Sequence, residues 1–317
     1  MHELLRELTQ HNIGQYGFSV PLRDHSTWRI GGSADLLVVP HSVEQVQALM
    51  RALNRLSIPF VVIGDGSNIL FDDAGVRGVV VKIGRHLSRF EISGVWITAE
   101  AGIFVPRLVR QIGGAGLTGW EHAIGIPGTV GGLVLMNGGS MQKSVGNMVD
   151  RVWAVNRSGA LVEFAHTDCK FEYRCSALQD RGNIIVRVRL QGIPGDSHSI
   201  RKEMLRILRT RRSKFPMKLP NCGSVFLSDP AMYAAVGAPG KIIEQCGLKG
   251  YRVGDAMIPQ LHANFIVNLG TARSVDVLSI IQQVRKTVQE RTGVLLMCEV
   301  RYISPECRVM PAHEARI

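Results

Sequence analysis

Three stretches of the chain repeat apolar residues at every third or fourth position, which is the spacing of an amphipathic helix. They are residues 43–56, 105–114 and 274–292. Ser42 and Gln45 have the spacing of a capping box before the first stretch. We expect Ser274 to cap the third helix and Gly293 to end it. A shorter helix is expected within residues 239–247.

Short apolar or alternating runs, bounded by glycine, proline and polar residues, predict strands. These runs are residues 35–40, 58–64, 78–83, 94–99, 183–190, 262–268 and 294–303. Residues 151–164 predict a hairpin that turns at Asn156–Gly159. The strand–helix–strand start indicates α/β organisation. Residues 192–195 predict a boundary, and residues 304–317 a loose tail.

The composition of the chain is typical of globular proteins with a hydrophobic core. Its 317 residues are 45% hydrophobic and 20% charged, enough for two or three domains. The first twelve residues lack the pattern of a secretory signal, and no apolar run approaches the length needed to span a bilayer. The six cysteines form no CxxC pair, so we expect reduced thiols, a cytoplasmic location and no metal site.

The net charge of +11 favours anionic partners such as nucleotides or phosphorylated substrates. Eight lysines and arginines fall within residues 201–218, where Leu205, Ile207 and Leu208 predict an amphipathic helix with a basic outer face. That face is either simply solvated or attracts a phosphorylated ligand. No nucleic-acid-binding motif is present, so no nucleic-acid partner is expected.

Two glycine-rich stretches suggest a phosphate-bearing ligand. FVVIGDGSNIL places Gly64 and Gly66 after a strand, but Ile69 stands where the dinucleotide fingerprint needs glycine, and no helix pattern follows. The turn is therefore either an ordinary tight turn or a nest of N–H groups that binds an anion. GIPGTVGGLVLMNGG, residues 125–139, either packs within a core or lets main chain approach a ligand.

Eight segments occur in a fixed order: TWRIGGSADLLVVP (27–40), VIGDGSNIL (62–70), GIPGTVGG (125–132), YRCS (173–176), CGSVF (222–226), GLKGYRVGDA (247–256), HANFIVN (262–268) and EVRYI (299–303). In this order they resemble the UDP-N-acetylenolpyruvoylglucosamine reductases, the MurB or UDP-N-acetylmuramate dehydrogenase family. The resemblance implies an α+β fold. It also implies that a two-part FAD-binding region of vanillyl-alcohol-oxidase (PCMH) type, residues 1–84 and 85–195, precedes an α/β substrate-binding domain, residues 196–317.

The resemblance also implies FAD as cofactor, with NADPH as co-substrate. We expect FAD to be bound non-covalently, because no His or Cys lies where we would expect a bond to the flavin. The turn after the second strand would lie on the FAD pyrophosphate, and the second glycine-rich stretch would border the flavin. The implied cofactor-binding residues are Gly64, Gly66, Ser67, Asn68, Gly125, Ile126, Gly128, Thr129 and Gly132.

The implied reaction reduces the enolpyruvyl ether of UDP-GlcNAc-enolpyruvate in peptidoglycan precursor synthesis. Arg174 matches the family's catalytic arginine, which grips a carboxylate as its charge grows. Ser224 matches the proton donor, and Glu299 a second acid whose pKa burial should raise. From the residues alone, Arg174 could be in a surface ion pair and Ser224 a turn serine. Glu299 could pair with Arg301, two positions along a predicted strand.

Tyr173, Lys218 and Asn221 are the implied substrate-binding residues, beside Lys214. Residues 227–229 and 258–261 depart from the common family pattern. They leave open a diverged flavin oxidoreductase that acts on another sugar nucleotide or enolpyruvyl compound. The short 228–240 linker indicates the shorter family type, with Tyr233 as a possible gate. We expect a monomer whose partners are the UDP-sugar and NADPH, without nucleic acid or membrane.

Overall fold

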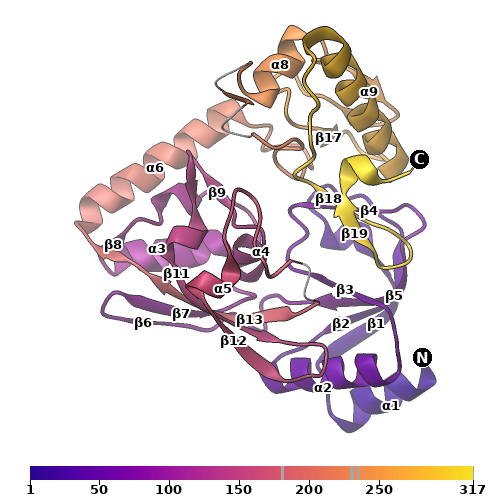
Figure 1. Cartoon of the computed structure of the whole chain (residues 1–317), viewed down its shortest axis with the longest axis vertical. Helices are drawn as coiled ribbons and strands as arrows, with labels where there is room; N and C mark the ends of the chain where they lie inside the picture. The colour runs from indigo at the N-terminus through magenta and orange to yellow at the C-terminus, as the bar shows by residue number, and fades with distance from the viewer. Residues whose placement is uncertain (180–181, 229–231, 234–235, 317) are drawn as a thin grey trace. The chain divides into compact units, whose positions relative to one another are not determined.

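The computed structural model describes residues 1–179, 182–228, 232–233 and 236–316 (Figure 1). The chain divides into two compact units, neither of which is one continuous segment. Unit 1 comprises residues 1–17, 37–65 and 80–211, and unit 2 comprises residues 18–36, 66–79 and 212–317. The three-part division at residues 84 and 195 stays a prediction.

Unit 1 contains a five-stranded antiparallel sheet with the order β12-β11-β13-β7-β6 (Figure 1). Its strands are β6 Phe90–Ser93, β7 Trp96–Glu100, β11 Val149–Val155, β12 Leu161–Ala165 and β13 Ile184–Gln191. The predicted hairpin joins β11 to β12, and the N–H of Asn156 donates to the carbonyl of Ala160 at 2.9 Å. In β13 the predicted inward residues Ile184, Val186, Val188 and Leu190 are all buried.

Six helices include residues of unit 1: α1 His2–Gln10, α2 Val43–Arg55, α3 Val105–Gly114, α4 Val130–Leu135, α5 His166–Cys169 and α6 Ser197–Lys214. The helix predicted at residues 43–56 is confirmed, and the N–H of Gln45 donates to Ser42 Oγ at 3.3 Å. The predicted capping box differs in one bond, because Gln45 Oε1 accepts from His41 N–H at 2.6 Å. The helix at residues 105–114 is also confirmed.

The predicted basic helix is α6, which begins and ends four residues earlier than the basic stretch 201–218. Its buried residues are Ile200, Met204 and Ile207, and the first two lie against Gly113 of α3. Leu205 was expected among its apolar residues but is 46% exposed. The buried face is therefore rotated from the expected one, since residues 200, 204 and 207 share one side of a helix.

A four-stranded sheet has the order β1-β2-β5-β3. Its strands are β1 Gln15–Pro21, β2 Ser33–Val39, β3 Phe60–Ile63 and β5 Val76–Lys82. Two further antiparallel pairs are β8 Leu117–Thr118 with β14 Ile193–Pro194, and β9 Gly139–Ser140 with β10 Lys143–Ser144. Short 3₁₀ helices cover Leu22–His25, Glu121–Ala123, Val145–Met148 and Ala312–Glu314.

Unit 2 is built around α9 Ser274–Thr292, with α8 Pro239–Gln245 packed against it (Figure 1). The expected inward residues of α9 are buried: Val277, Leu278, Ile281, Val284 and Val288. Gly293 ends α9 in a left-handed conformation, as predicted. Ser274 is the first helical residue rather than the cap, and its N–H donates to Asp73 Oδ1 at 2.8 Å.

Two small sheets complete unit 2. In the first, β18 Arg301–Ile303 runs parallel to β4 Ile69–Phe71 and antiparallel to β19 Val309–Pro311. The second has the order β15-β16-β17, with strands Arg252–Val253, Ala256–Met257 and Val267–Asn268.

Two predicted strands are much shorter in the structure. Only β17 remains of residues 262–268, and only β18 of residues 294–303. The reason is that neighbouring side chains take up backbone hydrogen bonds that a regular sheet would form. Asn264 bonds both backbone groups of Phe226, and His313 accepts from Cys298 N–H. The apolar pattern agrees with burial at Leu296, Cys298 and Val300, whereas Leu295 and Met297 are exposed, and it did not predict the strand pairing.

The C-terminal tail is ordered, contrary to the loose segment expected at residues 304–317. It contributes β19, and Ala312 and Ala315 are buried in the core of unit 2. Ala312 N–H donates to the Val300 carbonyl at 2.9 Å. Across the described residues, no helix is both long enough and apolar enough to cross a bilayer.

Candidate active site

The two glycine-rich stretches of the sequence meet in unit 1. Gly64 follows β3, and Thr129 precedes α4. A Cβ atom on Gly64 would lie 2.3 Å from Thr129 Oγ1, so only glycine fits there. Thr129 is buried and caps α4, since its hydroxyl accepts from Gly132 N–H at 3.4 Å. The close approach joins segments that are distant in sequence.

Close packing against protein atoms also explains why residue 125 of this region is a glycine. A Cβ atom on Gly125 would lie 2.2 Å from Cδ of Arg211 and 2.4 Å from its Nε. Arg211 comes from α6, and burial lowers the pKa of its guanidinium. The bare main chain at Gly64 and Gly125 therefore serves contacts within the protein. Gly128, which precedes Thr129, has a φ of +113°, a conformation that favours glycine.

Sequence reasoning missed two residues beside this loop. Arg211 was one of eight basic residues, but its position eleven residues after Ile200 continues the buried face of α6. That helical phase could have identified it. His122 is buried, and its Nδ1 lies 3.1 Å from the Gly119 carbonyl. Burial lowers the pKa of its imidazole, so the neutral form is favoured.

Arg174 lies in a tight turn held by the end of the same glycine-rich stretch. Glu172 and Cys175 exchange two backbone hydrogen bonds of 3.0 and 3.1 Å across this turn. Arg174 has a left-handed backbone, with a φ of +54°. Its Nη2 donates to the Gly139 carbonyl at 2.9 Å, and Asn137 Nδ2 donates to the Glu172 carbonyl at 2.6 Å. The main chain thereby fixes the position of the guanidinium.

Tyr173 lies next to Arg174 at the tip of the turn and is 44% exposed. The Arg174 guanidinium carbon lies 5.5 Å from the centre of the Tyr173 ring, within the range of a cation–π contact. At the base of the turn, Ser176 Oγ donates to the Leu135 carbonyl at 2.7 Å. An aromatic ring and a cation are thus presented together on an anchored turn.

In unit 2, the turn after Gly64 continues through Gly66, Ser67 and Asn68. Gly66 is left-handed, with a φ of +65°, and a Cβ atom there would lie 2.0 Å from the His25 carbonyl oxygen. Within the described ranges, the N–H groups of Gly66 and Asn68 donate to no backbone carbonyl. Free N–H groups in such a turn can bind an anion.

Asn68 also links this turn to Glu299. Asn68 Nδ2 donates to the Glu299 carbonyl at 3.2 Å, and Arg301 N–H donates to the Asn68 carbonyl at 3.0 Å. Glu299 is half-buried and lies before β18 rather than in it. Strand alternation therefore gives no reason for Glu299 and Arg301 to share a face, contrary to the expectation from sequence.

Ser224 lies on the segment that pairs with the Glu299 segment. Glu299 N–H donates to the Val225 carbonyl at 2.8 Å, and Leu227 N–H donates to the Met297 carbonyl at 2.8 Å. These bonds form a short antiparallel ribbon from residues 225–227 and 297–299. Ser224 is half-buried and follows Gly223, whose φ is +78°. The structure therefore brings Asn68, Ser224 and Glu299 into one region of unit 2.

The remaining predicted residues are more exposed or bonded locally. Lys218 is exposed, and Tyr233 is 49% exposed. Asn221 Oδ1 accepts from Gly223 N–H at 2.9 Å, so this side chain shapes the loop before Ser224. Ile126 N–H donates to the Ala123 carbonyl at 3.0 Å. Asp229, one of the departures noted in the sequence, lies outside the described residues.

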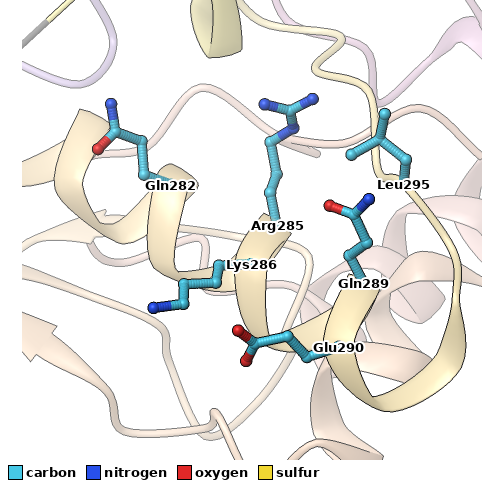
Figure 2. Close-up of a pocket in the computed structure, with 6 residues that line it drawn as sticks. All are labelled: Gln282, Arg285, Lys286, Gln289, Glu290 and Leu295. Atoms are coloured by element: carbon cyan, nitrogen blue, oxygen red, sulfur yellow. The ribbon is translucent and has the colours of Figure 1, made fainter.

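Unit 2 also has a surface hollow that is lined by residues other than the predicted site residues. It has a volume of about 330 Å³ and lies on α9 and the segment after it (Figure 2). Its lining residues are Gln282, Arg285, Lys286, Gln289, Glu290 and Leu295. None of these described lining residues belongs to the predicted site.

Comparisons with known proteins bear on what this arrangement does. A family model described as "FAD binding domain" matches residues 34–165. A second model, "UDP-N-acetylenolpyruvoylglucosamine reductase, C-terminal domain", matches residues 215–303. A solved structure of MurB from Thermus caldophilus covers 91% of this chain and 98% of its own, with a TM-score of 0.76 and 33% identity. The predicted fold class, an FAD-binding region followed by a substrate-binding domain of this family, is confirmed.

Relatives match almost the full length of the chain. UDP-N-acetylenolpyruvoylglucosamine reductase 1 of Corynebacterium glutamicum is 46% identical over 300 residues, 95% of this chain and 90% of that protein. The protein of the same name from Bacillus subtilis is 36% identical and covers 96% of this chain and 99% of its own length. Identity at this level over both parts shows that the chain belongs to the UDP-N-acetylenolpyruvoylglucosamine reductase (MurB) family.

Proposed function

We propose that this protein reduces the enolpyruvyl ether of UDP-GlcNAc-enolpyruvate to a lactyl ether, using FAD as cofactor and NADPH as reductant. The product would be UDP-N-acetylmuramate, a precursor of peptidoglycan. The observation that carries the proposal is the 46% identity to a named reductase over 95% of the chain. Relatives named for this activity favour it over the alternative, a diverged oxidoreductase with another substrate.

FAD would bind non-covalently at the two glycine-rich regions. The N–H groups of Gly66 and Asn68 fit the pyrophosphate, because they donate to no backbone carbonyl within the described ranges. Ser67 belongs to the same turn. Gly64, Gly125, Ile126, Gly128, Thr129 and Gly132 would border the cofactor, and contacts within the protein already hold several of them in place. When bound, FAD would supply the hydride that adds to C3 of the enolpyruvyl group.

Arg174 would bind the substrate carboxylate. Negative charge grows on C2 and on this carboxylate during hydride addition. A guanidinium can stabilise that charge by donating two parallel hydrogen bonds to the carboxylate. The anchored turn supports this role, because a preorganised charge needs no movement at the moment of reaction.

Ser224 would donate its hydroxyl proton to C2, and Glu299 would act as the second acid beside the carboxylate. Their segments are joined by the Glu299 N–H bond to Val225. That pairing supports a shared role, because proton transfer depends on groups held within hydrogen-bonding reach of the reacting atom.

Tyr173, Lys218 and Asn221 would contact the UDP-sugar. Lys218 is exposed and suited to a diphosphate, whereas Asn221 would act mainly through the loop before Ser224. We further propose that the protein works as a cytoplasmic monomer with three domains divided at residues 84 and 195. Sedimentation of the purified protein would test the monomeric state.

The decisive experiment measures NADPH oxidation by the FAD-loaded protein. UDP-GlcNAc-enolpyruvate should drive rapid oxidation, while UDP-GlcNAc, which lacks the enolpyruvyl group, should not. A yellow protein that oxidises no NADPH with the first compound would overturn the proposed substrate. Activity with a different enolpyruvyl or sugar-nucleotide compound alone would then favour the diverged alternative.

A further inference from the structure

The ribbon that joins the Ser224 and Glu299 segments has two edges, and a side chain binds each edge. On one edge, Asn264 Oδ1 accepts from Phe226 N–H and Asn264 Nδ2 donates to the Phe226 carbonyl, each at 2.9 Å. On the other edge, Cys298 N–H donates to Nδ1 of His313 at 3.1 Å. Side chains thus replace the strands that would otherwise flank the ribbon.

His313 belongs to the tail that follows β18. The family model matches only to residue 303, so this histidine lies beyond it. Its side chain is 6% exposed and sits in the 3₁₀ helix Ala312–Glu314. The adjacent bond from Ala312 N–H to the Val300 carbonyl ties the same tail to the other side of Glu299.

We propose that His313 is a positioning residue for Glu299. By accepting the N–H of Cys298, it fixes the main chain one residue before Glu299, the proposed second acid. This role rests on the proposed function, because it matters only if Glu299 takes part in the reaction. It extends that function by making the tail part of the support of the site.

The contact requires a particular protonation state. Nδ1 can accept only without a proton, so the ring is neutral with its hydrogen on Nε2. Burial lowers the pKa of His313, and the charges of Arg285 and Arg301 lower it further, while Glu314 opposes them. Arg285 comes from α9 (Figure 2). Its Nε donates to the Leu296 carbonyl at 2.8 Å. The buried Cys298 thiol also lies at this contact, and burial raises its pKa to about 12.

The lowered pKa of His313 makes the fold less stable at acidic pH. Because the folded-state pKa is below the ordinary value of histidine, the neutral ring stabilises the fold above that ordinary value. The contribution is lost as pH falls through the folded-state pKa. Protonated Nδ1 then carries a hydrogen that opposes Cys298 N–H, so the ribbon loses this bond.

The test compares two variants in the FAD-loaded protein. H313L keeps the bulk but has no acceptor, and kcat should fall about tenfold with the KM for NADPH unchanged, since small misplacements of a catalytic group cost this much or more. H313N places an oxygen near the position of Nδ1, so it should restore kcat and remove the acid-side loss that His313 causes in the wild type. H11N, an exposed histidine at the end of α1, is the matched control and should behave like the wild type.

Hydrogen exchange at the Cys298 amide provides a readout independent of substrate. Protection should be lost in H313L and retained in H313N. An active wild type whose kcat and pH profile are unchanged in H313L would overturn the positioning role, even if H313L melts at a lower temperature. If H313L does not fold, an H313N acid limb identical to that of the wild type would overturn it. A wild type without activity would instead overturn the proposed function, and this role with it.

Discussion

Asn68 and Glu299 are 231 residues apart in the chain, yet the Asn68 amide donates to the Glu299 carbonyl at 3.2 Å. Asn68 was expected to bind the cofactor, and Glu299 was expected to act as an acid in the reaction. Their direct bond means that the turn proposed for the pyrophosphate also supports the segment that carries the acid. The turn proposed to bind the cofactor and the segment that carries Glu299 are therefore joined directly within unit 2.

Replacing Arg174 with lysine should reduce kcat by roughly 10- to 100-fold. Lysine keeps the charge but lacks the planar fork that binds a carboxylate through two hydrogen bonds. The left-handed backbone at this position is equally demanding for both residues, so folding should be unaffected. Steady-state NADPH oxidation measures the effect, and an unchanged melting temperature controls for structure. Activity equal to that of the wild type would remove Arg174 from the site.

Replacing Ser224 with alanine should separate the two halves of the reaction. NADPH should still bleach the flavin colour at the wild-type rate, because no proton donor to C2 is needed for that step. Return of the colour on adding UDP-GlcNAc-enolpyruvate should slow by about 10²- to 10⁴-fold, the usual worth of a positioned acid. Stopped-flow absorbance follows both steps. Equal slowing of the two halves would point to a structural fault rather than a lost proton donor.

Replacing Gly125 with alanine should destabilise the protein by about 1–3 kcal/mol. The added Cβ would lie 2.2 Å from Cδ of the half-buried Arg211, so the Arg211 side chain or the loop must shift. Retention of FAD should weaken as well. Gly114, the exposed last residue of α3, has no atom within 4 Å of an added Cβ and supplies the control. Denaturant unfolding of G125A and G114A should differ; equal stabilities would mean that Gly125 is not packed as described.

Thiol labelling should distinguish the exposed Cys175 from the buried Cys222. Burial raises the pKa of Cys222 to about 11, so almost no thiolate forms there at mildly alkaline pH. Its sulfur also lies 3.3 Å from the Ile69 carbonyl, within the core. Cys175 is exposed in the turn that carries Arg174. Peptide mass spectrometry after brief alkylation should find Cys175 modified and Cys222 intact, and the reverse order would contradict the placement of both.

Helical periodicity was the most reliable guide to this fold. The helices at residues 43–55, 105–114 and 274–292 lie where repeating apolar residues placed them, since a buried face leaves a clear signal at this length. Their caps were less predictable. Asp73 binds the first N–H of α9 from 201 residues away, and no local pattern encodes such a partner.

Strand prediction failed where side chains replace strand partners. The apolar runs at residues 262–268 and 294–303 contain many buried residues, although Leu295 and Met297 are exposed. Asn264 and His313 take up backbone hydrogen bonds of the ribbon. The prediction of a loose tail was wrong because its buried apolar residues, among those described, are the small Ala312 and Ala315, which give little hydrophobic pattern.

The chemistry of the site was only partly readable from the sequence. Motif resemblance selected Arg174, Ser224 and Glu299, whose roles stay predictions, but spacing alone could not bring the last two onto paired segments. Arg211 was hidden among other basic residues, although its helical phase marks it as inward-facing. His313 lies beyond the family match and carries no motif at all.

Unit 2 is built from three separate segments of the chain, and this has a consequence for its folding during translation. Trp28, near the start of the chain, donates its indole N–H to the Ile266 carbonyl at 2.7 Å, and β4 pairs with β18 near the end. Ile266 is translated 238 residues after Trp28, so the early segments of unit 2 leave the ribosome before the residues that pack against them. A fragment that starts at residue 212 would lack Trp28 and Leu70, two side chains of its own hydrophobic centre. Unit 2 can thus complete its hydrophobic core only after the segment that contains β18 has been translated.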